Sequence, residues 1–461
     1  MMLQIKKGIT FFLSIAASIA TAHSQQTVLD NYIQEAFKNN QGLAQKNIDL
    51  TKSLYALDEA KSYYLPQIAV VANYTRASGG RAIDIPVGDL LNPVYATLNQ
   101  LTQSAKFPQV ANQSVLLNPN NFYDAKLHTT MPLINTEIWY AKKIKQENIT
   151  AQQAAINVYK RSLVKDVKST YYLYYQSSKS VEIYEAQLQL VNQNIRMNES
   201  LLKNGVRNRT SLTRAQSEQQ KVLSAITQAK NTQKNAQAYF NFLLNKPLQS
   251  DIIIDSSLVQ LPIVETAIDT SKVKNRDELK QINQAQNMAV LQQKMQQSYL
   301  VPKLNTFLDL GAQDYNFNVN NKSLYYLFGI GLQWDIFSFG QKKAKIQQAK
   351  TDVSNVQAQY NQTASALQLE LTTAYNNYQS ALSIYQSALA DVALAEKYYR
   401  DQLRVYQEGQ LLYIELLDAQ NQLTEARMQS NISQAQVLTR MAEIERAEAS
   451  YPLQNITVSN K

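Results

Sequence analysis

The side chains that most often carry out enzyme chemistry are scarce in this chain of 461 residues. It has no cysteine and only two histidines, His23 and His128, which excludes thiol catalysis, disulfides and zinc–thiolate sites. The sequence contains no glycine-rich phosphate-binding loop and no cluster with metal-ligand spacing. We therefore expect no enzyme, no cofactor and no metal site.

The charged side chains are the remaining groups that could form a binding site. The formal net charge is +9, but the Lys and Arg residues are spread among Gln and Asn and form no dense block. This spacing is typical of solvated helix faces, so we expect no nucleic-acid partner. Two acidic residues, Glu415 and Asp418, lie three positions apart, which places them on one face of a helix.

Four long runs without glycine or proline dominate the chain, in two pairs that are each divided by one glycine. They are Leu133–Asn204 and Val206–Lys246 around Gly205, and Gln341–Glu408 and Gln410–Tyr451 around Gly409. Because glycine and proline are the strongest helix breakers, each pair predicts a long helical hairpin. A helix over the first run would be about 100 Å long.

The long runs carry two neighbouring apolar stripes. One stripe in the first run passes through Val181, Val191 and Leu202 with Asn198 in its polar gap, and the stripe beside it has Asn194 in its gap. A single stripe suits a two-stranded coiled coil, whereas two stripes suit a helix with a neighbour on each side, as in a closed ring. A wide buried face in a simple bundle is the alternative.

Shorter segments between the hairpins alternate between apolar and polar residues, which predicts strands. We expect strands at about 67–75, 122–131, 303–312 and 324–335, with Pro132 ending the second one. A helix broken near Gly42 is expected before the first strand, and a short helix near Val94–Gln103 within the loop 78–121.

The sequence is an internal repeat of helix, strand, loop, strand and helical hairpin. Leu43 and Pro66 recur as Leu279 and Pro302, both 236 positions later. The predicted parts are a first repeat over 25–248 with its hairpin over 133–246, a connector over 249–273, a second repeat over 274–451 with its hairpin over 337–451, and a tail over 452–461.

Residues 1–24 have the pattern of a signal peptide: Lys6 and Lys7 precede a short apolar core over Ile9–Ala20, with small residues after it. We expect export from the cytoplasm, without lipidation because no cysteine follows the signal. Four strands with one apolar face cannot close a membrane barrel, since the smallest known has eight. An open edge cannot face lipid, and a packed eight-stranded barrel would not conduct, so three copies are favoured over two.

This arrangement resembles the TolC family of outer-membrane efflux proteins, the outer membrane factors of tripartite pumps. The most specific motifs begin with Gly205 and Gly409. After six intervening residues, these glycines are followed by Leu212-Thr213-Arg214-Ala215-Gln216 and Leu416-Leu417-Asp418-Ala419-Gln420. The resemblance implies a mainly α chain with a small β part. It further implies a homotrimer with a 12-strand β-barrel in outer-membrane lipid and a 12-helix tunnel across the periplasm.

The resemblance also implies a function. Members are passive exit ducts of tripartite efflux or type I secretion systems, with a periplasmic adaptor and an inner-membrane transporter as partners. The adaptor docking points would be Gly205, Val206, Gly409 and Gln410, which also serve as simple turns. The loop 78–121 would lie outside the cell.

The family's entrance gate maps onto the helix tips. Its acidic pair after the second glycine corresponds to Glu415 and Asp418, which three copies would multiply to a ring of six carboxylates. Its tyrosine three residues before that glycine matches Tyr406, but its arginine two residues after the glycine is replaced by Leu411.

Three arginines lie at the first tip instead: Arg207, Arg209 and Arg214. We hypothesise that they pair with Glu415 or Asp418 to hold the entrance shut. In the alternative, all are solvated and the acids only favour a helix N-terminus.

One alternative class is a periplasmic coiled-coil scaffold or pump adaptor. An adaptor would have one hairpin and flanking glycine-rich β domains. This chain has two predicted hairpins and only eleven glycines, which counts against that class.

Overall fold

The computed structural model describes residues 28–206, 208–255 and 269–453, so the predicted signal, Arg207 and parts of the connector and tail lie outside the described residues. The chain divides into two compact units. We call Lys52–Ile149 with Ala285–Val356 the strand unit, and Met1–Thr51, Thr150–Gln284 and Gln357–Lys461 the helical unit. The longest helices contribute to both units.

The fold is mainly helical, as predicted. The helices are α1 (Val28–Asn39), α2 (Gln41–Ser62), α3 (Val87–Leu101), α4 (Thr136–Lys203), α5 (Arg209–Leu243), α6 (Asp277–Gln297), α7 (Gln341–Gln407) and α8 (Tyr413–Glu448), with short 3₁₀ turns η2 (Thr270–Asn275) and η3 (Ser298–Leu300). No helix in the described ranges has the length and apolar character needed to cross a membrane.

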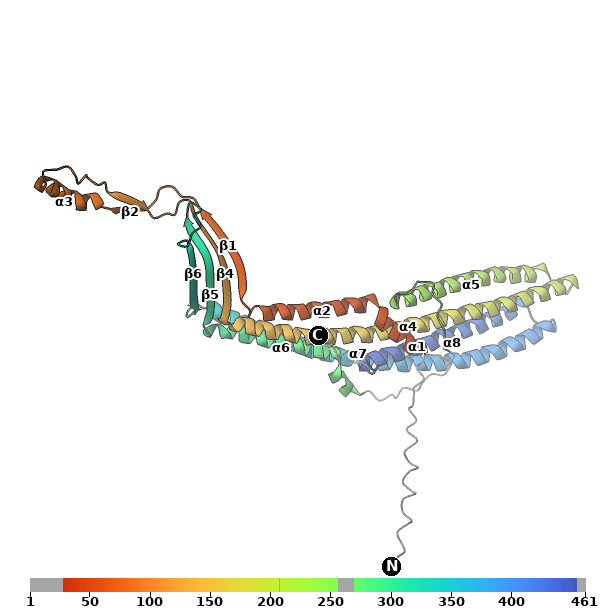
Figure 1. Cartoon of the computed structure of the whole chain (residues 1–461). Helices are drawn as coiled ribbons and strands as arrows, with labels where there is room; N and C mark the ends of the chain where they lie inside the picture. Colours follow the sequence, from red (N-terminus) through yellow and green to blue (C-terminus); the bar gives the residue numbers. More distant parts are fainter. Residues whose placement is uncertain (1–27, 207, 256–268, 454–461) are drawn as a thin grey trace, which may run out of the picture. The chain divides into compact units, whose positions relative to one another are not determined.

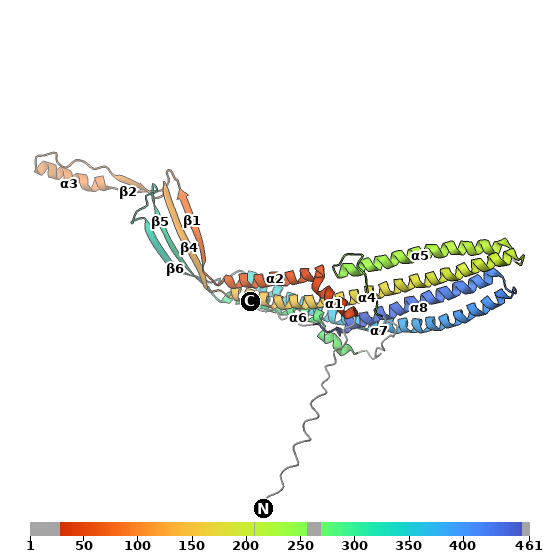
Figure 2. The ribbon, with the colours of Figure 1, turned by 45° about the vertical axis from the view of Figure 1, so that its right-hand side comes forward.

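Two helical hairpins build the helical unit, in which α5 returns along α4 and α8 returns along α7 (Figures 1 and 2). The long arms α4 and α7 have 68 and 67 residues. Val191 of α4 packs with Val222 and Ile226 of α5. Leu371 of α7 packs in a second cluster with Val437 of α8. The apolar stripes therefore bury the seams along the hairpins, which stabilises helices too long to be held by propensity alone.

The break between α1 and α2 is at Asn40, whereas the sequence pointed to Gly42. The Asn40 side chain donates to the Leu243 carbonyl at 2.8 Å and accepts from the backbone N–H of Leu43 at 3.0 Å. At Gly42 a Cβ would lie 1.9 Å from the Tyr159 hydroxyl oxygen, so a larger residue there would have to displace that ring. An asparagine that bonds the backbone competes with the helix, and this explains the break.

The strand unit contains an antiparallel sheet in the order β1 (Gln67–Thr75), β4 (Phe122–Ile134), β5 (Lys303–Tyr315) and β6 (Leu324–Gln333). β1 and β6 are its edges. One face is apolar and open: Val70, Tyr326 and Leu332 are 78%, 77% and 66% exposed. Large apolar side chains left open in this way indicate a surface that lipid or another chain covers.

Pro132 does not end β4, as the sequence suggested. It lies opposite Asn305 of β5, and a bulge follows before Ile134. The last pair between β1 and β4 is Gln67 with Thr130, so beyond this point β4 has a neighbour on one side only. Proline is tolerated there because no second ladder needs its missing N–H group.

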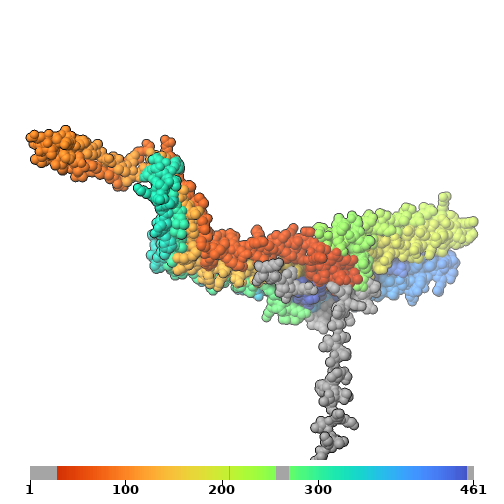
Figure 3. Space-filling view, viewed as in Figure 1, coloured from red at the N-terminus to blue at the C-terminus, as the bar shows by residue number. Residues whose placement is uncertain are grey.

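The predicted loop between β1 and β4 is an arm with structure of its own (Figure 3). A two-stranded ribbon of β2 (Ala82–Ile85) and β3 (Gln113–Leu116) leads to α3, which begins seven residues before the expected start at Val94. Asn92 ties this helix to the returning chain, since its amide donates to the Val110 carbonyl at 3.0 Å and accepts from the Val110 N–H at 2.8 Å.

Candidate entrance gate at the hairpin tips

Both hairpin tips have the same backbone turn. Gly205 and Gly409 have φ angles of +72° and +80°. At the first tip, the N–H of Gly205 donates to the Leu202 carbonyl at 3.0 Å and that of Val206 to the Leu201 carbonyl at 2.9 Å. The bonds at the second tip are equivalent, so both tips end in Schellman motifs. A Cβ at either glycine would meet nothing within 4 Å, so the left-handed φ is what favours glycine.

The two candidate gate acids lie on the exposed face at the start of α8. Glu415 accepts a hydrogen bond from the backbone N–H of Leu412 at 3.2 Å, which caps the helix. Asp418 accepts from Nε2 of Gln422 at 2.7 Å. Both carboxylates remain open to solvent, and their charge favours the α8 N-terminus.

The first-tip arginines that the structure describes, Arg209 and Arg214, are exposed near the start of α5. Between these two arginines and Glu415 or Asp418, the described part of one chain contains no ion pair. Arg207 lies outside the described residues. A lock between arginine and carboxylate therefore stays a prediction. The predicted docking residues Gly205, Val206, Gly409 and Gln410 are all exposed at the tips.

Among the candidate gate residues that the structure describes, Tyr406 is the one that is completely buried. Its hydroxyl donates to Oδ1 of Asn198 on α4 at 2.7 Å, which joins the second hairpin to the first. One turn earlier on α4, Nδ2 of Asn194 donates to Oε1 of Gln420 on α8 at 2.6 Å. We call Asn194, Asn198, Tyr406 and Gln420 the amide ladder.

The amide ladder was only partly visible in the sequence. Asn194 and Asn198 stood out as polar gaps in apolar stripes, and Gln420 belonged to the repeated tip motif, but nothing in the sequence paired them. In the structure, no ladder residue is more than 2% exposed. The polar gaps are thus positions at which the two hairpins are hydrogen-bonded to each other.

The ladder is not fully satisfied. Nε2 of Gln420, the hydroxyl of Tyr413 and Oε1 of Gln402 are buried without a hydrogen-bond partner in the described part of the chain. Burial also raises the pKa of Tyr413. A buried polar atom without a partner costs about 1–3 kcal/mol, which offsets part of the stabilisation from the apolar cluster around Tyr406, Tyr413 and Leu416.

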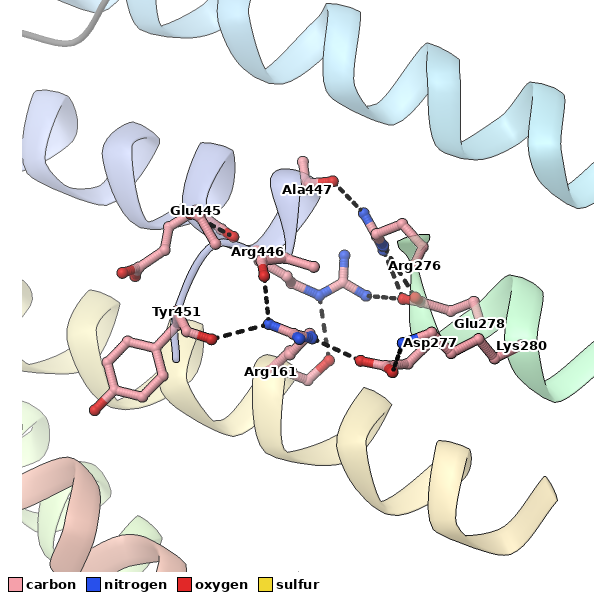
Figure 4. A network of polar contacts seen from close by, with 12 residues as sticks. Arg161, Arg276, Asp277, Glu278, Lys280, Glu445, Arg446, Ala447 and Tyr451 are labelled. Atoms are coloured by element: carbon pink, nitrogen blue, oxygen red, sulfur yellow. Dashed lines mark hydrogen bonds and ion pairs between the residues drawn. The ribbon is translucent and has the colours of Figure 1, made fainter. Parts of the chain in front are cut away.

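A second polar network, around Arg276, lies elsewhere in the helical unit (Figure 4). The Arg276 side chain is completely buried and donates to the Ala447 carbonyl at 2.7 Å and to the Glu278 carboxylate at 2.9 Å. Arg446 of α8 contacts Glu278 and Glu370 of α7. These bonds connect α6, α7 and α8.

Arg161 adds α4 to the same network. It donates to the Asp277 carboxylate at 2.8 Å and to the backbone carbonyls of Ala449 and Tyr451 at 2.7 and 3.1 Å. We call Arg161, Arg276, Asp277, Glu278 and Arg446 the arginine clamp. It joins the helices at one level, and the amide ladder joins the two hairpins nearer the tips.

Comparison with known proteins agrees with this architecture. The family model described as outer membrane efflux protein matches residues 32–246 and 271–449. A search of curated protein sequences gives no match.

Solved channel structures share the fold. The CmeC outer membrane channel of Campylobacter jejuni has 14% identity and a TM-score of 0.73, over 91% of this chain and 85% of that chain. VceC of Vibrio cholerae has 15% identity and a TM-score of 0.69, over 91% and 95%. The open MtrE channel of Neisseria gonorrhoeae has 14% identity and a TM-score of 0.71, over 91% and 88%.

The family match covers both repeats and includes both hairpins and all four strands of the sheet. The predicted resemblance is therefore confirmed, and the family is one of channels rather than enzymes. This chain belongs to the outer membrane efflux protein family, whose members are exit ducts of efflux systems.

Proposed function

We propose that three copies of this chain form an outer-membrane channel that is the passive exit duct of a tripartite efflux or type I secretion system. The observation that carries the proposal is the sheet, which has an open apolar face and two unpaired edges, β1 and β6. Such edges are too costly to leave in lipid, and they are satisfied when β6 of one copy pairs with β1 of the next.

Three copies supply twelve strands and twelve long helices. The strands form a barrel in the outer membrane, and the helices continue into the periplasm as a tunnel. The arm between β1 and β4 then lies outside the cell.

The partners follow from this placement. A periplasmic adaptor docks on the tips at Gly205, Val206, Gly409 and Gln410, and an inner-membrane transporter supplies the driving force. The family membership and the exposure of these four residues support the assignment.

The entrance lies at the tips and is closed by two kinds of contact. The amide ladder joins the hairpins within a copy. Glu415 and Asp418 from three copies form a ring that repels itself unless Arg207, Arg209 and Arg214 neutralise it. On opening, the hairpins separate at the amide ladder near the tips but stay joined at the arginine clamp.

Cysteine crosslinking tests the assembly against a native background that has no cysteine. We would place one cysteine at Val71 on β1 and one at Leu327 on β6, then add a short bifunctional crosslinker to cells. The expected products are crosslinked dimers and trimers on a denaturing gel. A matched control has cysteines at Ala72 and Ala125, which are partners within one chain.

The control should give only crosslinked monomer. A β1–β6 variant that stays monomeric while the control reacts would contradict the assembly. Electron microscopy of the extracted protein should then show a threefold tube, because long helices of about 100 Å continue into strands of roughly 35 Å.

A further inference from the structure

The polar face of the sheet carries a charge cluster that the entrance gate does not use. Nζ of Lys126 on β4 lies 3.0 Å from Oδ2 of Asp309 on β5 and 3.7 Å from Oδ2 of Asp124. The hydroxyl of Tyr325 on β6 donates to Oδ1 of Asp124 at 2.7 Å. Nδ1 of His128 is hydrogen-bonded to Oδ1 of Asp309. We call these five residues the strand charge cluster.

The register of the sheet builds this cluster. His128 lies directly opposite Asp309, and Lys126 lies opposite Gly311. A Cβ at Gly311 would be 2.7 Å from the Cβ of Lys126 and 2.5 Å from the Ala125 carbonyl oxygen. Glycine therefore leaves the room in which Lys126 reaches both carboxylates, and cross-strand pairing fixes the positions of the charges.

Within the hydrogen-bonded pair of His128 and Asp309, solvent reaches the histidine much more easily than the aspartate. The side chain of Asp309 is 4% exposed, whereas that of His128 is 36% exposed. Asp309 from β5 contacts His128, and Lys126 from the same strand as His128 binds the Asp309 carboxylate as well. On β6, the residue opposite Asp309 is the apolar Leu327. On β1, Ala69 lies opposite His128. A proton can therefore reach the histidine from water without the sheet having to open.

The opposite face of the same strands is apolar, with Leu127 and Leu310 45% and 49% exposed. If that face meets lipid, as in the proposed function on which this inference rests, the cluster faces the barrel lumen. Three copies place three clusters around one pore.

We infer that the strand charge cluster sets the charge selectivity of the barrel and that His128 makes this selectivity depend on pH. With His128 neutral, two carboxylates and one ammonium leave one negative charge per chain and three per trimer. Protonation of His128 in every copy cancels them. Histidine is the side chain that ordinarily changes charge between pH 5 and 8. The lumen therefore prefers cations at pH 8 and loses that preference on acidification.

The experiment uses the full-length channel in planar lipid bilayers with a KCl gradient, and the reversal potential gives the K⁺/Cl⁻ permeability ratio. The background carries Glu415→Gln and Asp418→Asn, so that the tip carboxylates do not contribute. The ratio should fall at least about twofold between pH 8 and pH 5.5. His128→Gln, which keeps polar atoms but takes up no proton, should match its parent at pH 8 and abolish the fall.

Two further variants complete the test. Asp309→Asn should lower the ratio already at pH 8. Asp314→Asn, a carboxylate in register with Tyr123 on the other face of β5, should change nothing. A pH dependence that survives in His128→Gln would overturn the inference, and so would a ratio independent of pH in the background. A protein that forms no channel at all would instead contradict the proposed function.

Discussion

The hydroxyl of Tyr406 and the amide oxygen of Asn198 are 2.7 Å apart in the seam between the two hairpins, and neither residue is more than 1% exposed. This bond joins residues 208 positions apart in the chain. Water cannot replace it while the seam is closed, so the seam has to separate for the bond to break. The tips are therefore held by a contact that is either made or lost as a unit.

Tyr406→Phe should loosen the tips. The substitution removes the donor and leaves Oδ1 of Asn198 buried without it, at a cost of about 1–3 kcal/mol. We expect higher single-channel conductance in lipid bilayers and greater entry of large antibiotics into cells. Tyr398→Phe on the same helix is the control, because Tyr398 is 38% exposed. Equal conductance in the two variants would argue against the Tyr406 bond as a closing contact.

The pair Asn194 and Gln420 should behave differently when one or both partners are changed. Gln420→Leu strands the Asn194 amide, so the free energy of unfolding should fall by about 1–3 kcal/mol. The double variant Asn194→Leu with Gln420→Leu replaces both partners by apolar groups and should recover most of that loss. Denaturant unfolding of the detergent-solubilised protein measures all four members of the cycle. Additive losses would show that the two amides are not coupled.

Charge reversal at the first tip tests the arginine lock. Arg207→Glu with Arg209→Glu adds negative charge beside the proposed ring of Glu415 and Asp418 carboxylates, so conductance should rise. Adding Glu415→Lys and Asp418→Lys restores opposite charges and should bring conductance back toward its original value. Lys234→Glu reverses one exposed charge on α5 away from the tip and serves as control. If conductance is unchanged in the double reversal, the arginines are solvated tip charges only.

The arginine clamp predicts an acid limit to stability. Burial alone would raise the pKa of Asp277 and Glu278, but Arg161 and Lys280 act on Asp277, and Arg276 acts on Glu278, so that both pKa values lie below their usual range. The unfolded chain then binds protons more readily than the folded one. The stabilisation is complete above the unfolded pKa values, about 3.9 and 4.3, and is lost as the pH falls through the lower folded values.

The measurement is thermal unfolding by circular dichroism from pH 7 to pH 2. Asp277→Asn should lower the melting temperature at neutral pH and flatten the decline below pH 4. Asp58→Asn, at an exposed ion pair with Lys61, should leave the curve unchanged. A decline of the same steepness in Asp277→Asn would assign the acid sensitivity to other carboxyls.

Much of the fold was predictable because it depends on local rules. The long helices lack helix breakers, and a single glycine separates the two helices of each hairpin. Alternation in the four segments of the sheet indicates which face of each strand is apolar. Pro132 misled for the same reason. It was interpreted as the end of a strand, but β4 continues through it, and α3 likewise continues through Pro93, because neighbouring contacts decide whether a missing N–H matters.

The polar contacts were less predictable, since each depends on two segments far apart in sequence. Arg276 and Arg446 look like ordinary helix charges until packing brings α6 and α8 together. Asn194 and Asn198 interrupt the apolar stripes, but only the juxtaposition of α4 with α7 and α8 gives them Gln420 and Tyr406 as partners. Similarly, alternation placed His128 on the polar face, yet only the register put it opposite Asp309.

The two tip turns have the same hydrogen-bond pattern although their surrounding residues differ. In the proposed trimer, six tip turns with the same main-chain conformation would surround the axis, two from each chain. The tip end of the trimer would then approach sixfold symmetry, although its sequence has only threefold symmetry. A partner that recognises the tip turns by their main-chain shape would find six equivalent binding positions. Substitution of side chains at the tips would then leave the complementarity between the main-chain turns and the partner unchanged.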